Sequence, residues 1–182
     1  MKPPFIIIHR HPYEEPYHLN LVISASNGVM SGTLEYYCNA EDLGEVGGKL
    51  AVFPERKGDT YVYELGSPRP EDRFAFHFAL RTSTLDSAGH CALQLTMNNN
   101  RPSPDDVSCS FSIRAEPAAI NRLGRLLTAF GELMHSELRW SDTDGELIEG
   151  QTTIAEPDGP ANGSHPIRLE TNSTSSADGS RR

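Results

Sequence analysis

The sequence predicts an α+β fold: an antiparallel sheet of about six strands in the order ββαββββα, with two helices packed on one face. Three observations lead to this prediction. Six segments alternate apolar and polar side chains with the period of two that half-buried strands show. Two segments repeat apolar residues every three or four positions, as amphipathic helices do. The connections between consecutive strands are also short enough for antiparallel pairing.

The first two predicted strands form a hairpin. Apolar residues alternate from Tyr17 to Ala25 and again from Met30 to Cys38. Between them lies Asn27-Gly28, a dipeptide that favours a tight turn because both positions tolerate positive φ. The preceding residues, 1–16, contain four prolines and are expected to be irregular, with strand character only at Phe5 to Ile8.

A helix is predicted next. Asn39 is a suitable N-cap residue, and Pro54 ends the segment. Leu43, Val46, Leu50 and Phe53 form one apolar stripe at helical spacing. Three glycines within the segment each weaken a helix by roughly 1 kcal/mol relative to alanine. We therefore expect this helix to be stabilised by docking on the sheet.

Four further strands and a closing helix follow. The strands are expected at 61–65, 74–80, 91–97 and 107–115, where apolar residues alternate again. The last helix opens at Pro117, and its apolar stripe runs from Ile120 to Met134 in steps of three and four. We expect that stripe to lie across the sheet.

Composition divides the 182 residues into a single domain at 1–150 and a polar tail at 151–182. The tail has few large apolar residues, so it is expected to be disordered. It carries four acidic and three basic side chains, which leaves −8 of the total net charge of −9 on residues 1–150. Such an acidic domain repels nucleic acid and anionic lipid, and it favours a basic protein partner.

Cysteine usage and the N-terminal sequence predict a cytoplasmic location. Three cysteines without close pairs indicate no disulfide framework and a reducing compartment. The apolar run at the start is only four residues long, too short for a signal peptide or a membrane span. No cofactor motif is recognisable, so no cofactor is expected.

The absence of a catalytic constellation leads to the prediction of a non-enzymatic protein-binding module. One sheet face is expected to stay uncovered by helices, and that face with its acidic loops is the predicted contact surface. Acidic groups there would attract a basic partner and raise its association rate. The predicted partner-binding residues are Glu14, Glu15, Glu35, Glu41, Asp42 and Glu64.

Three other hypotheses remain open. His77 and His90 lie on neighbouring predicted strands, and a shared histidine site there would suit a small enzyme or a ligand-binding protein. The uncovered sheet face or an edge strand would alternatively allow self-association into a homo-oligomer. A cluster near the N-terminus contains residues of metal-binding types without the spacing of a known zinc site. Its members are His9, His11, His18, Glu14 and Glu15.

Several of these features together resemble small bacterial proteins of uncharacterised function. They are the Asn27-Gly28 hairpin, the helix ending at Phe53-Pro54, the aromatic strand at 74–80, the Gly89-His90 strand start and the closing Leu-rich helix. Some proteins of that type are encoded near polymorphic toxins and are thought to be immunity proteins. The resemblance covers roughly residues 15–140 and implies an inhibitor of a basic toxin or effector domain. It assigns a role to no single residue.

Overall fold

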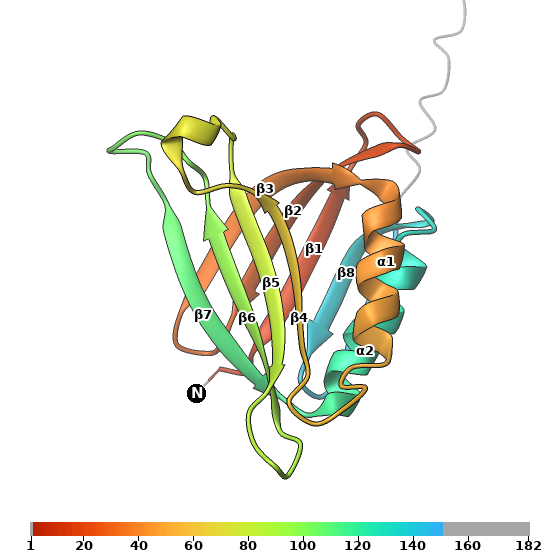
Figure 1. Cartoon of the computed structure of the whole chain (residues 1–182). Helices are drawn as coiled ribbons and strands as arrows, with labels where there is room; N and C mark the ends of the chain where they lie inside the picture. Colours follow the sequence, from red (N-terminus) through yellow and green to blue (C-terminus); the bar gives the residue numbers. More distant parts are fainter. Residues whose placement is uncertain (1, 151–182) are drawn as a thin grey trace, which may run out of the picture. The chain divides into compact units, whose positions relative to one another are not determined.

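The computed structural model of the chain describes residues 2–150, and it confirms the α+β class. Within this part of the chain, two α-helices and a short 3-10 helix accompany the strands (Figure 1). The elements are β1 (Phe5–His11), β2 (His18–Ser26), β3 (Ser31–Asn39), α1 (Ala40–Ala51), β4 (Thr60–Gly66), η1 (Pro70–Asp72), β5 (His77–Thr84), β6 (Cys91–Asn98), β7 (Ser108–Ala115), α2 (Pro117–Phe130), β8 (His135–Ser141) and β9 (Gly145–Glu149).

The strands form two antiparallel sheets, so the prediction of a single sheet of about six strands is wrong in this detail. One sheet has the order β3-β2-β1-β8-β9, and the other has the order β4-β5-β6-β7. Alternation in a sequence shows which side chains of a strand point inward, but it does not show to which sheet the strand belongs. The sequence predicted that β2 and β3 are neighbours, but it did not show that β1 lies between β2 and β8.

The inner faces of the two sheets share one apolar core. In the first sheet, Ile8, Ile23 and Leu34 are aligned across three strands and buried. In the second sheet, Leu80 is aligned with Leu95 and Phe111. Tyr36 of β3 stacks on Phe78 of β5 with ring centroids 4.7 Å apart, which joins the two faces.

β3 of the first sheet lies against β6 and β7 of the second sheet. A β-carbon placed on Gly32 would overlap the Cys109 sulfur, so only glycine fits this position of β3 without a shift of its neighbour. The Asn27 side chain, in the turn before β3, donates a hydrogen bond to the Ser112 carbonyl of β7 at 3.3 Å. β3 and β7 belong to different sheets and form no backbone ladder with each other. Side-chain contacts close the core between them.

The two helices lie side by side along one flank of the sheets (Figure 1). Leu43 and Val46 of α1 and Leu123 and Leu127 of α2 are in the core, and inward side chains of both sheets surround them. The two helices lie together on one side, as predicted, and their buried side chains contact inward side chains of both sheets. The Asn121 amide of α2 also donates to two carbonyls at the end of α1.

Most strand bounds differ from the prediction by one or two residues, and three elements differ by more. Residues 5–11 form β1, a central strand of its sheet, whereas strand character was expected only at Phe5 to Ile8. The strand expected at 74–80 begins only at His77, and Phe74 is exposed. The last helix ends at Phe130, so Met134, expected in its stripe, is 71% exposed.

β8 and β9 were not predicted, although they complete the first sheet. β8 pairs with β1, and Trp140 on β8 is buried. The Trp140 indole donates a hydrogen bond to the Ala119 carbonyl of α2 at 2.8 Å, which fixes the closing helix to this sheet.

Within residues 2–150, no helix is both long and apolar enough to cross a membrane. The predicted disordered tail, 151–182, lies outside the described residues.

Candidate functional site

The six acidic residues predicted to bind a partner do not share a single sheet face. Glu35 lies on the outer face of the β1-containing sheet, whereas Glu64 lies on the outer face of the other sheet. Glu64 is also paired with His77 at 2.7 Å. The remaining four residues lie in the turn between β1 and β2 and in the first turn of α1, and they are Glu14, Glu15, Glu41 and Asp42.

The start of α1 and the turn between β1 and β2 meet at one end of the sheet. His18 at the start of β2 pairs with Asn39 at the end of β3, and the Ala40 amide donates to the Tyr17 carbonyl at 2.9 Å. The elements enclose a surface groove of about 400 Å³, which we call the tyrosine groove. Its lining residues are Tyr13, Glu14, His18, Tyr37, Cys38, Asn39, Asp42 and Leu65.

Two tyrosine rings, those of Tyr13 and Tyr37, line this groove. Tyr13 and Tyr37 pack edge to face with ring centroids 5.1 Å apart. They are nevertheless 52% and 43% exposed, and Tyr17 nearby is 76% exposed. Large aromatic side chains are enriched in the buried centres of protein interfaces, where tyrosine offers apolar area with little entropy to lose. An exposed pair of them beside a groove is therefore typical of a contact surface.

The groove carries negative charge that basic side chains of the domain do not neutralise. Among residues 2–150, no lysine or arginine forms an ion pair with Glu14, Glu35, Glu41 or Asp42. Glu14 is paired with His18 at 3.1 Å, and both side chains are largely exposed. Glu15, by contrast, is paired with Arg10.

Asp42 is held in a fixed orientation at the groove wall. Its Oδ2 atom accepts a hydrogen bond from the main-chain N–H of Asn39 at 3.2 Å. It accepts another from the Tyr63 hydroxyl at 3.1 Å. Burial, and to a smaller extent the charge of Asp42, raises the pKa of the Cys38 thiol to about 12. The pKa of Tyr63 is raised by burial first, with Asp42 again contributing. The Asp42 carboxylate thus makes the local potential more negative.

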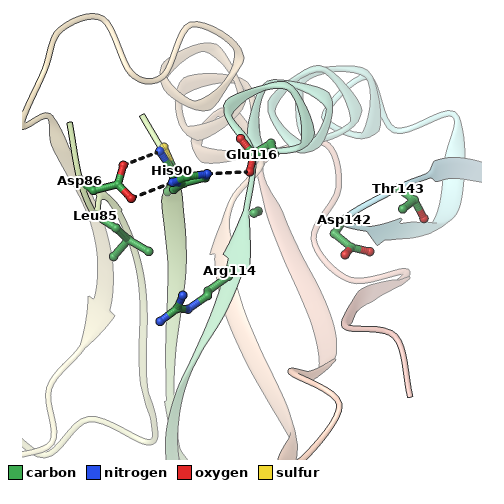
Figure 2. A pocket seen from close by; sticks show the side chains of 9 residues that line it. Leu85, Asp86, His90, Arg114, Glu116, Asp142 and Thr143 are labelled. Atoms are coloured by element: carbon green, nitrogen blue, oxygen red, sulfur yellow. Dashed lines mark hydrogen bonds and ion pairs between the residues drawn. The ribbon is translucent and has the colours of Figure 1, made fainter. Parts of the chain in front are cut away.

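A second pocket, of about 740 Å³, lies around His90 at the start of β6 (Figure 2). The His90 Nδ1 atom is 2.7 Å from an Asp86 oxygen, and its Nε2 atom is 3.8 Å from Glu116. The hydrogen bond that the His90 ring donates to Asp86, together with the negative charges of Asp86 and Glu116, raises the pKa of His90. Asp142 and Thr143 of the β8–β9 turn stand apart from this cluster (Figure 2). All three members of the cluster are exposed, so their charges are well solvated.

His77 and His90 do not come together, contrary to the hypothesis of a shared histidine site. His77 begins β5 and is aligned with Asn98, whereas His90 precedes Cys91, which is aligned with Thr84. The two histidines therefore lie at opposite ends of the β5–β6 hairpin. His77 is buried and bonded to Glu64.

Two of the N-terminal histidines are paired with different carboxylates. His9 pairs with Glu137 of β8 at 2.9 Å, and His18 pairs with Glu14. In the part of the chain that the structure describes, no group of three or more histidine, cysteine, aspartate or glutamate side chains is placed to hold a metal ion.

Sequence reasoning found the acidic residues of the tyrosine groove but not its aromatic residues. Tyr37 follows the inward-pointing Tyr36 on β3, so the alternation alone marks it as an outward aromatic residue. Tyr13 lies in a turn without periodicity, and no sequence signal places it against Tyr37.

Comparisons with known proteins do not assign a family. No family model matches the chain, and no curated protein matches it. The structure of the plant transcriptional regulator PBF-2 is similar with a TM-score of 0.40 and 9% sequence identity. The match covers 72% of this chain and 76% of that one. This likeness is too low to carry a functional inference.

Proposed function

We propose that this protein is a non-enzymatic binding module that recognises a basic protein partner through the tyrosine groove. The observation that carries the proposal is the exposed Tyr13–Tyr37 pair beside carboxylates that no lysine or arginine of residues 2–150 neutralises. Aromatic rings supply apolar contact area, and the surrounding acids supply attraction over a longer range. The net charge of the chain, −9, acts in the same direction.

The resemblance to immunity-type proteins gives the class of partner to test first, a basic toxin or effector domain. An inhibitor of that kind works by covering its target, and this requires an exposed surface of complementary charge and no chemistry. The tyrosine groove supports this proposal, because Glu14 and Asp42 line it and Glu35 accepts a hydrogen bond from the Tyr37 hydroxyl at its edge. Glu64 faces away on the other sheet, so we leave it out of the proposed contact.

The proposal is tested by affinity capture from native cell extract with three forms of the full chain. The first is the wild type, and the second carries Tyr13→Ala and Tyr37→Ala in the groove. The third carries Glu55→Gln, an exposed acid beyond the far end of α1, and serves as the control. A specific partner is retained by the wild type and the control, is lost from the groove variant, and binds less as salt is raised.

The binding constant of the captured protein is then measured with purified components. We expect the double tyrosine substitution to weaken binding by about 2 kcal/mol or more, the cost typical of a central interface residue. Circular dichroism verifies that the groove variant is folded. Equal affinity for the wild type and the folded groove variant would remove the groove from the interface. Recovery of the protein alone, at the mass of a dimer by light scattering, would support self-association instead.

A further inference from the structure

We infer that the tyrosine groove receives an arginine side chain of the partner in preference to a lysine. This inference rests on the proposed function and specifies the chemistry that the groove recognises. It depends on the size of the groove, on the placement of its rings and on the free oxygens of its carboxylates.

The size of the groove suits part of a peptide rather than a whole domain. Its volume of about 400 Å³ is at the lower end of the range for pockets that bind small molecules. Tyr13, Tyr37 and Leu65 supply apolar wall, and Glu14 and Asp42 supply charge. A long side chain with an apolar stem and a cationic end matches this distribution.

The ring geometry favours a planar cation. In an edge-to-face pair, one ring presents its edge to the other, so the outer faces of the pair remain available. A guanidinium group stacks on such a face and is weakly hydrated, whereas an ammonium group is a compact and strongly hydrated charge. The exposed fractions of Tyr13 and Tyr37 show that the domain itself leaves these rings accessible.

The carboxylates favour a cation with several donors. Both hydrogen bonds that Asp42 accepts go to its Oδ2 atom, and they come from Asn39 and Tyr63. Glu35 is not part of the groove lining but borders it, and it accepts hydrogen bonds from Asn20 and from the Tyr37 hydroxyl, both at its Oε1 atom. Each carboxylate therefore keeps an oxygen without a protein donor among residues 2–150. Guanidinium has five N–H groups in a fixed fork, which suits carboxylates that are already oriented.

The inference is tested with two soluble probe peptides of equal length and charge, one with three arginines and one with three lysines in a Gly/Ser background. Each is titrated into the full chain at low salt, and binding is followed by NMR. We expect the arginine peptide to bind at least about 3-fold more tightly, with shifts at Tyr13 and Tyr37. Tyr37→Leu should abolish the preference, Tyr37→Phe should keep it, and Glu55→Gln should change nothing.

The outcomes separate this inference from the proposed function. Equal affinity of the two peptides, with both weakened by Glu14→Gln or Asp42→Asn, would overturn the arginine preference and leave a basic partner in place. A preference that persists in Tyr37→Leu would also overturn it, because the ring would then play no part. Binding that no groove variant changes would overturn both proposals. Failure of both peptides to bind would overturn the arginine inference, and the capture experiment would still decide the proposed function.

Discussion

Gly47 of α1 and Gly124 of α2 face each other at the contact between the two helices. A β-carbon on Gly124 would lie 2.6 Å from the Gly47 carbonyl oxygen, and one on Gly47 would lie 2.7 Å from the Gly124 carbonyl oxygen. The backbones therefore approach too closely for any side chain. From the sequence, the glycines were expected only to weaken α1. At Gly47, however, the absence of a side chain allows α1 to pack against α2, and this packing stabilises α1.

Alanine substitutions in α1 should have opposite effects at neighbouring positions. At Gly48 a β-carbon would meet no atom within 4 Å, so Gly48→Ala should stabilise the protein by about 1 kcal/mol through helix propensity. Gly47→Ala should destabilise it by roughly 1–3 kcal/mol, because the helices must move apart. Urea denaturation of the two variants measures both values. A stabilising Gly47→Ala would show that the helix contact is looser than described.

Trp140→Phe should destabilise the fold although both side chains are aromatic. The substitution removes the hydrogen bond to the Ala119 carbonyl and leaves a space in the core. We expect a loss of about 2 kcal/mol in the free energy of unfolding. Circular dichroism is the suitable probe, since Trp140 is the only tryptophan of the chain and the variant lacks its fluorescence. A change below the error of the measurement would contradict the anchoring role.

His90 should titrate above its ordinary pKa of 6.5, because Asp86 and Glu116 favour the protonated ring. Asp86→Asn should lower the pKa of His90 toward 6.5, and NMR of the ring protons measures the change. Asparagine can still accept the backbone hydrogen bonds that Asp86 accepts in this turn. An unchanged pKa in the variant would show that Asp86 is not the cause.

The shifted pKa values of His90 and Asp86 also predict how the free energy of unfolding depends on pH. The pKa of His90 is raised in the folded state, so its contribution is present below pH 6.5 and is lost as pH rises through the folded value. The pKa of Asp86 is lowered, so its contribution is present above pH 3.8 and is lost as pH falls through the folded value. The stability difference between the wild type and Asp86→Asn should therefore be largest between these two limits and shrink on either side.

Cys38 should resist alkylation in the folded protein. With a thiol pKa of about 12, only about one molecule in ten thousand carries the thiolate at pH 8, and the side chain is buried. Iodoacetamide at that pH should modify Cys38 only after urea is added, as measured by peptide mass spectrometry. Comparable modification with and without urea would mean that this end of β3 opens readily in the native state.

Local features of the fold were predictable from the sequence, whereas its long-range arrangement was not. Asn27-Gly28 identified the β2–β3 hairpin, and the apolar stripes identified α1 and α2. The division into two sheets was missed because alternation carries no information on which strands are neighbours. β8 was missed because only Leu138 and Trp140 alternate on its inner side.

The candidate site was predictable in its charge and not in its shape. Glu14 and Asp42 were named from composition and position, and both line the groove. Contact between Tyr13 and Tyr37 depends on a turn whose path follows from the packing of β1 and β2. No periodic pattern covers such a turn, so the central feature of the site required the three-dimensional structure.

The pairing of β1 with β8 also determines when this protein can fold during its synthesis. β1 is complete after residue 11, but its second neighbour, β8, ends at residue 141. Until the ribosome has released that segment, one edge of the N-terminal hairpin sheet lacks its partner and stays open to pairing with other chains. A protein that ended before β8 would keep this open edge permanently. Stop codons placed before residue 135 should therefore give aggregated products, even though the tyrosine groove is encoded entirely by the first 65 residues.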